Sequence, residues 1–220
     1  MKNKHNYQAV ISAKATLSSV NVGLLYSFMI KRIAKGYSTS EVSFLMGHHT
    51  DYIKQKEELI SIGFTFEDMH CFRQAVEEKS LTGLISNFED LKTMGSYQLL
   101  KTSDPIKTEI KMIRFEKDGR EIPIFHLVEN NKMENHSKIS EQQIAAEVTA
   151  KLNVLFEGQM FYKPQSPLQI YQECRNTLSE TLAPRHLQAA LLTLTKKKDF
   201  PKLKRIKSKD HGSMYEKVFD

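Results

Sequence analysis

The sequence is poor in cysteine and in long apolar runs, and each shortage excludes a class of protein. Its two cysteines, Cys71 and Cys174, lie far apart without CxxC spacing, which excludes a disulfide framework and a zinc knuckle. No stretch approaches the roughly 20 uninterrupted apolar residues of a membrane-spanning helix. Lys14 interrupts the apolar run near the N-terminus, and no cleavage pattern closes it. We therefore expect no signal peptide and a cytoplasmic location.

Motifs of common enzymes are absent as well. The sequence contains neither a glycine-rich phosphate-binding loop of the Walker or Rossmann type nor the HExxH and GxSxG patterns of hydrolases. The adjacent His48 and His49 cannot share one helix face, and no cluster of cysteines or carboxylates indicates a metal site. We expect a protein that is not an enzyme, with no catalytic residues, no metal and no cofactor.

The composition is that of a folded chain with an uneven charge distribution. The 220 residues are 40% hydrophobic, which is enough for one large domain or two small ones. The net charge is +6, and the last 25 residues hold nine Lys or Arg against four Asp or Glu. This basic end favours a polyanionic partner, and a solvated tail is the alternative.

Short helices fill the N-terminal third of the sequence. Apolar residues at helical spacing predict a first helix that ends at Gly36. Ser38 and Glu41 then have the spacing of a capping box, which predicts a second, short helix. Gly47 supplies a turn before a third helix, and a fourth follows. We expect a helical domain over residues 1–80.

A β-hairpin is the clearest feature of the middle region, residues 81–130, which also has a helix-like apolar patch. β-Branched and aromatic residues flank Asp118-Gly119, as in a hairpin with a tight turn. A two-residue turn would place Phe115 opposite Ile122 and would put Pro123 on an edge strand. A longer loop is the alternative, because the tight register also opposes two glutamates.

The third region follows a polar stretch, residues 131–139, which we interpret as a linker. Residues 140–220 then give the order helix, short strand, helix, helix and two strands. The short strand is expected at residues 159–162, and the two last strands flank a basic loop that contains glycine.

Five residues of the N-terminal domain match the pattern of a known DNA-binding motif. The pattern requires an apolar and a small residue in one helix, a glycine in the turn, and an apolar residue and a glutamate in the next helix. These positions are filled by Val42, Ser43, Gly47, Ile53 and Glu57. The domain therefore resembles the helix-turn-helix of the Cro and phage-repressor (XRE-like) family, in which the apolar pair packs the two helices together.

The resemblance implies DNA contacts at the start of the second helix, which enters the major groove in such proteins. Lys54 and Gln55 are suited to base edges, whereas threonine and tyrosine hydroxyls can bind phosphates. The DNA-binding residues implied are Thr39, His49, Thr50, Asp51, Tyr52, Lys54 and Gln55. His48 departs from the pattern, and three acidic residues leave the recognition helix without net positive charge. A helix-turn-helix that docks a protein partner is the alternative.

The C-terminal region is similar to a winged helix in the order and length of its elements. That resemblance implies a second recognition helix that exposes Arg185, His186 and Gln188. It also implies a basic wing that carries Lys204, Arg205, Lys207 and Lys209. The fold class predicted for the whole chain is mainly α with small β elements: an N-terminal helix-turn-helix bundle, a middle β-hairpin and a winged-helix-like module over residues 140–220.

Together these observations predict a DNA-binding transcriptional regulator. Its expected partners are double-stranded DNA and a second copy of the chain, without a membrane or a small-molecule ligand. The alternative is a protein–protein interaction adaptor, or an antitoxin-like protein, whose helix-turn-helix fold does not read DNA. A third hypothesis, an enzyme acting on nucleic acid, lacks the acidic cluster that would hold its metal.

Overall fold

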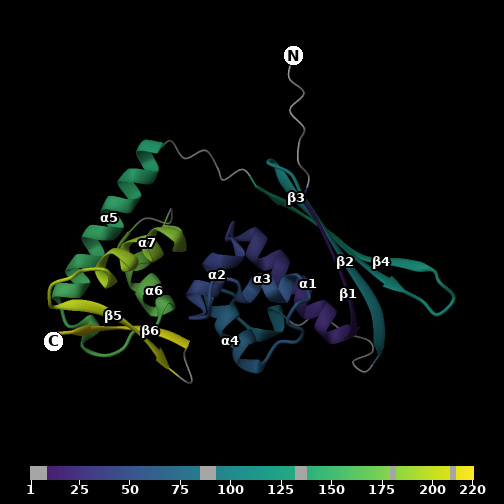
Figure 1. Cartoon of the computed structure of the whole chain (residues 1–220), viewed down its shortest axis with the longest axis horizontal. Coiled ribbons are helices and arrows are strands. Elements are labelled where there is room, and N and C mark those ends of the chain that lie inside the picture. Colours follow the sequence, from purple (N-terminus) through teal and green to yellow (C-terminus); the bar gives the residue numbers. More distant parts are fainter. Residues whose placement is uncertain (1–8, 85–92, 132–137, 179–181, 209–211) are drawn as a thin grey trace, which may run out of the picture. The chain divides into compact units, whose positions relative to one another are not determined.

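The computed structural model describes residues 9–84, 93–131, 138–178, 182–208 and 212–220 (Figure 1). The chain divides into two compact units. The first unit comprises Met1–Gly36, Lys54–Arg73 and Glu78–Asn135. The second unit comprises Tyr37–Ile53, Gln74–Glu77 and His136–Asp220. None of the helices within the described ranges combines the length and the apolar character that crossing a membrane requires.

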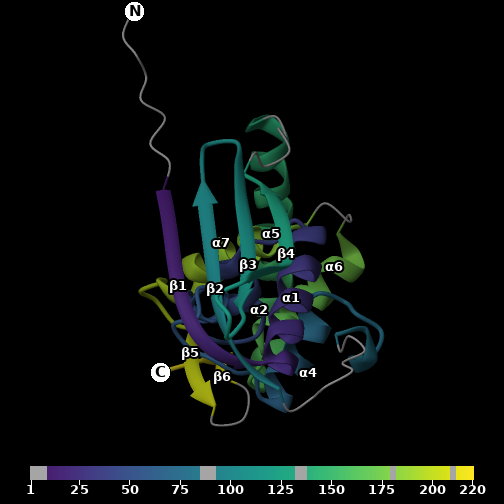
Figure 2. The same ribbon diagram turned by 90° about the vertical axis from the view of Figure 1, so that its right-hand side faces the viewer.

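A four-stranded antiparallel sheet is the framework of the first unit. Its strands lie in the order of the sequence (Figure 2): β1 (Ala9–Ser18), β2 (Met94–Ser103), β3 (Lys107–Phe115) and β4 (Glu121–Asn130). The predicted fold class is therefore wrong, because this sheet makes the chain mixed α/β rather than mainly α. The expected hairpin is only the β3–β4 half of the sheet. The two other strands escaped prediction because few large apolar residues alternate along them.

The hairpin has the longer of the two loops considered. Phe115 pairs with Glu121 and Ile113 pairs with Pro123, so residues 116–120 form the connection. The register shifts between Met112 and Ile113, where the strand pair has a β-bulge. Pro123 lies on the edge strand β4, as expected, where its missing N–H leaves no gap in the sheet.

Helix α1 (Ser19–Ala34) packs against one face of this sheet. The Ser18 side chain caps it by accepting a hydrogen bond from the Asn21 amide, and Gly36 follows its end with φ of 67°. The buried residues of the core it shares with the sheet are Leu17, Val22, Leu25, Met29, Tyr97, Leu99, Ile110 and Met112. Helix α4 (Phe66–Ala75) adds Phe72, which stacks on Phe28 with ring centroids 3.8 Å apart.

The second unit consists of short helices and a strand pair. Its elements are α2 (Thr39–Leu45), α5 (Lys138–Glu157), α6 (Pro167–Thr177), α7 (Pro184–Thr195), β5 (Lys202–Ser208) and β6 (Gly212–Val218). Helix α3 (Tyr52–Glu57) contributes residues to both units. The predicted capping box of α2 is present, and α6 begins with a second one, at Ser166 and Gln169, followed by Pro167.

The short strand expected before α6 is displaced. Residues Met160–Tyr162 form a 3₁₀ turn, and the extended residue is Gln165 instead. Its amide donates to the Tyr215 carbonyl at 2.9 Å, and the Tyr215 amide donates back at 2.8 Å. This single bridge adds a third, very short strand beside β6. The apolar run at 160–162 was misread because it packs as a turn against α5.

Tyr171 on α6 holds part of this unit together through its hydroxyl. The hydroxyl donates to the Leu182 carbonyl at 2.7 Å and lies 3.0 Å from the Tyr37 hydroxyl. Burial, and then the hydrogen bond with Tyr37, raise the pKa of Tyr171, so the ring stays neutral.

Replacing Tyr171 by phenylalanine should lower the free energy of unfolding by about 1–3 kcal/mol, because it removes both hydrogen bonds from a buried site. Urea unfolding monitored by circular dichroism would measure the loss. Tyr162→Phe is the matched control, since the Tyr162 side chain is exposed, and its effect should stay within about 0.5 kcal/mol. Equal effects of the two variants would contradict this account of Tyr171.

Candidate nucleic-acid interface

The two C-terminal strands, here called the basic strand pair, present an exposed row of cations. Lys202 pairs with Val218 and Lys204 pairs with Glu216, so these four side chains share one face. Arg205 and Lys207 alternate with them and project from the other face. Lys204, Arg205 and Lys207 are exposed, whereas Lys209 lies outside the described residues. Arg205 also donates to the Ser213 hydroxyl at 2.7 Å, which orients its guanidinium.

More cations lie between helix α7 and this strand pair. Lys196, Lys197 and Lys198 are all exposed. The Lys196 amide closes the last turn of α7 on the Leu192 carbonyl at 3.1 Å, so the first of these lysines lies where the helix dipole is negative. The basic residues that give the sequence its excess of positive charge thus lie at the end of α7 and along β5.

Carboxylates cover the start of α7, contrary to the expectation of a cationic recognition helix. The Glu41 carboxylate accepts from the Arg185 amide at 3.2 Å, and Glu141 accepts from the Arg185 guanidinium at 3.0 Å. His186 is only 7% exposed, and Gln188 is half-buried. The prediction that α7 exposes His186 is therefore wrong. Its partners come from α2 and α5, which are distant in the sequence.

The geometry of His186 explains why it is held inside. Its Nδ1 accepts from the Ala183 amide at 3.2 Å, which leaves the proton on Nε2 to bond Glu141 at 2.8 Å. Hydrogen bonds from His186 and then from Arg185 lower the pKa of the Glu141 carboxyl. The start of α7 is thus stabilised by internal ion pairs and offers few donors to DNA.

The α2–α3 segment is held together by buried side chains and one buried hydroxyl. Val42 and Ile53 are buried, and Gly47 has φ of 75° in the turn between them. The buried Ser43 hydroxyl accepts from the Ile53 amide at 3.0 Å and donates to the Thr39 carbonyl at 2.7 Å, which joins the two helices. The DNA-binding role of this segment stays a prediction.

Its candidate contact residues differ in exposure. His49, Thr50, Asp51 and Lys54 are exposed, whereas Thr39, Tyr52 and Gln55 are half-buried. Tyr52 stacks on His48 with ring centroids 3.8 Å apart, which accounts for a histidine where the family has an apolar residue. Thr39, His49, Thr50 and Tyr52 belong to the second unit with the basic strand pair, and Lys54 and Gln55 belong to the first.

Two of the three acidic residues that weakened the DNA prediction are not on the surface. Glu57 is 1% exposed and binds Arg32, and Glu58 is buried with Lys101 3.5 Å away. Their charges are matched by buried or half-buried cations within the first unit. Asp51 is the remaining exposed acid near Lys54, so the surface of α3 is less negative than its sequence indicates.

The turn before α3 is also tied to the strand pair within the second unit. The Ser213 amide donates to the Gly47 carbonyl at 2.7 Å. A Cβ atom on Gly212 would lie 2.5 Å from that carbonyl oxygen, so only glycine fits there. The turn at Gly47 and the start of β6 therefore lie side by side.

Sequence reasoning missed one candidate feature, a groove of about 470 Å³ at the open end of the strand pair. Phe200, Lys202, Lys204 and Arg205 are among the residues that line it. An aromatic residue followed by lysines at alternate positions, Phe200, Lys202 and Lys204, is the sequence signal that would have found it. This pattern was not recognised, because the segment was interpreted from its charge alone.

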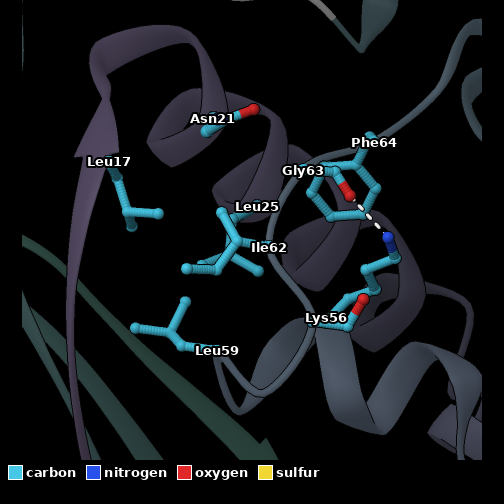
Figure 3. A pocket seen from close by; sticks show the side chains of 9 residues that line it. Leu17, Asn21, Leu25, Lys56, Leu59, Ile62, Gly63 and Phe64 are labelled. Carbon is cyan, nitrogen blue, oxygen red and sulfur yellow. Dashed lines mark hydrogen bonds between the residues drawn. The ribbon is translucent and has the colours of Figure 1, made fainter.

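Other potential sites in the described ranges are weak. A hollow in the first unit, lined mainly by apolar side chains, measures about 10 Å³, room for one water at most (Figure 3). Lys56 donates across it to the Gly63 carbonyl. Burial raises the pKa of the Cys71 thiol, and it raises the pKa of the Cys174 thiol to about 11, so both thiols stay protonated. The described residues contain no group of three or more potential metal ligands.

Comparison with known proteins gives no neighbour from which a function could be transferred. No protein-family profile, curated protein or solved structure matches the chain.

Proposed function

We propose that this protein binds double-stranded DNA as a transcriptional regulator, in the cytoplasm and as a homodimer. The observation that carries the proposal is the row of exposed cations on β5 and after α7. In the described part of the chain neither Lys204 nor Lys207 forms an ion pair. Duplex DNA carries one negative charge per ~1.7 Å of its axis, so such a row suits its backbone.

In this proposal, different elements supply the affinity for DNA and the recognition of bases. The basic strand pair supplies salt-dependent affinity for phosphates, and the exposed start of α3 supplies contacts to bases. The hydrogen bond between Ser213 and Gly47 supports this arrangement, because it places the strand pair beside the turn that precedes His49 and Thr50. The carboxylates at the start of α7 argue that α3, rather than α7, is the helix that enters the groove.

A selection experiment tests the proposal. The purified full chain is titrated with a pool of random duplexes at several salt concentrations, and the bound fraction is sequenced. A steep decrease in affinity with salt, together with an enriched sequence motif, would support a sequence-specific regulator. Absence of binding even at low salt would rule the proposal out.

Replacing Lys54 and Gln55 by alanine should reduce the affinity for the selected sequence by about 30-fold or more and leave the affinity for random duplexes nearly unchanged. The reason is that a good side-chain contact to a base contributes about 1–3 kcal/mol of discrimination. Fluorescence anisotropy with both duplexes would measure the change. The paired substitutions Lys117→Ala and Gln142→Ala, at exposed positions, are the control. An unchanged sequence preference would favour the adaptor described next.

A protein-interaction adaptor is the second candidate function. The observation that favours it is the outer face of the four-stranded sheet, where Val10 is 65% exposed and Val128 is 47% exposed. Ile124 on β4 is exposed as well. The two valines lie on the same face of the sheet, on its two edge strands, with Thr102 and Glu109 between them. Exposed apolar side chains on a sheet face are common where proteins associate. This candidate predicts that the substitutions of Lys54 and Gln55 leave DNA binding untouched.

A further inference from the structure

The groove of the basic strand pair combines cations with an exposed aromatic ring. It forms where β5 begins and β6 ends, next to Thr195 at the end of α7. Lys202 and Lys204 occupy alternate positions of β5, and Phe200 lies just before this strand. All three line the groove. The Lys202 ammonium lies 4.4 Å from the centroid of the Phe200 ring, which is still 45% exposed.

The charge lining the groove is positive. Lys202 and Lys204 contribute two cations, and Asp220 contributes one carboxylate. Arg205 also borders the groove, but its side chain projects from the other face of the strand pair and binds Ser213. Val218, across from Lys202, gives the floor an apolar patch beside the aromatic ring. The site therefore suits a ligand that has both anionic groups and flat apolar rings.

Two more exposed rings lie at the same end of β6. Tyr162 and Phe219 meet edge to face with centroids 5.9 Å apart and are 54% and 59% exposed. Below them the buried Lys217 ammonium donates to the Phe156 carbonyl at 2.7 Å and lies within 6 Å of both exposed rings. This cation–π cluster holds the pair in place despite its exposure.

We propose that the groove binds a single-stranded segment of nucleic acid, with an unpaired base stacked on Phe200 and phosphates on Lys202 and Lys204. Proteins commonly bind unpaired strands with cations that alternate with exposed aromatic rings, because every base has a face that can stack on such a ring. A base in a duplex is already stacked and cannot reach Phe200. The inference rests on the proposed function, since the same strand pair binds the duplex backbone, and it extends the substrate to DNA with an unpaired end or gap.

The test compares Phe200→Leu with the wild-type full chain on two labelled probes, an oligothymidine strand and a blunt duplex of equal length. Loss of the stacking ring should weaken binding of the single strand about tenfold and of the duplex less than twofold. Phe66→Leu, at an exposed phenylalanine of α4, should change neither affinity. Thermal unfolding of each variant shows whether the fold is retained.

The outcomes separate this inference from the proposed function. If the blunt duplex binds but the single strand does not, or if Phe200→Leu weakens both probes equally, the groove does not take unpaired bases and the regulator proposal stands. If neither probe binds at low salt, both proposals fail. If Phe200→Leu does not fold, a halogenated single strand is photo-crosslinked to the wild-type chain instead. A crosslink at Phe200 supports the inference, and crosslinks found only elsewhere overturn it.

Discussion

Replacing Arg32 by methionine should lower the free energy of unfolding by about 3–5 kcal/mol, because it leaves the buried Glu57 carboxylate and the half-buried Glu129 carboxylate without their cation. The Arg32 side chain is almost completely buried. Its Nε and one terminal nitrogen bind the two oxygens of Glu57 at 2.6 and 3.0 Å. Its terminal nitrogens also bind Glu129 at 2.6 and 2.9 Å. Burial alone would lower the pKa of Arg32, but the two carboxylates more than offset it, so the guanidinium stays charged.

Urea unfolding would measure the loss, and two comparisons make it specific. Arg120→Met removes the exposed ion pair with Asp118 and should change stability by less than about 0.5 kcal/mol. Adding Glu57→Gln and Glu129→Gln to Arg32→Met should recover part of the stability, because the stranded charges are gone. A loss below about 1 kcal/mol for Arg32→Met would show that this triad matters little.

Removing three cations of the basic strand pair should have the largest effect on DNA binding. The variant is Lys204→Ala with Arg205→Ala and Lys207→Ala. Each phosphate contact contributes about 0.9 to the slope of log affinity against log salt. If all three make such contacts, the slope should fall by about 2.7 and duplex affinity near 0.1 M salt should fall by two to three orders of magnitude. Fluorescence anisotropy over a salt series would measure both quantities.

A matched charge control decides whether position or net charge matters. Lys107, Lys111 and Lys117 are also exposed, but they belong to the first unit. Their replacement by alanine changes the net charge by the same amount and should alter the slope by less than about 1. Equal losses in the two triple variants would contradict a specific role for the strand pair.

Local signals in the sequence predicted the helix starts well. Ser38 with Glu41 and Ser166 with Pro167 specify their helix starts within four residues, since the cap bonds join near neighbours. The β3–β4 hairpin was also predictable because Asp118-Gly119 lies between its strands. These features depend on contacts between residues that are close together in the sequence.

The rest of the fold could not be predicted, because it depends on contacts between residues that lie far apart in the sequence. β1 pairs with β2 across more than 75 residues, and Ala13 and Ala15 give β1 little apolar alternation. The ion pairs of Arg185 and the hydrogen bond of His186 could not be foreseen, because nothing in the sequence links Glu41 and Glu141 to residues more than 40 positions away. For the same reason Glu57, which contacts Arg32 25 residues away, was assigned a surface charge.

The bond between Ser213 and Gly47 has a consequence for how binding specificity could evolve or be engineered. It is made entirely by main-chain atoms, at a place where Gly212 leaves no room for a side chain. Side chains at residues 48–52 can therefore be exchanged without loosening this anchor, provided that both glycines are kept. The segment is a suitable place to randomise in a library, because it can vary while the basic strand pair, for which we propose phosphate binding, stays unchanged.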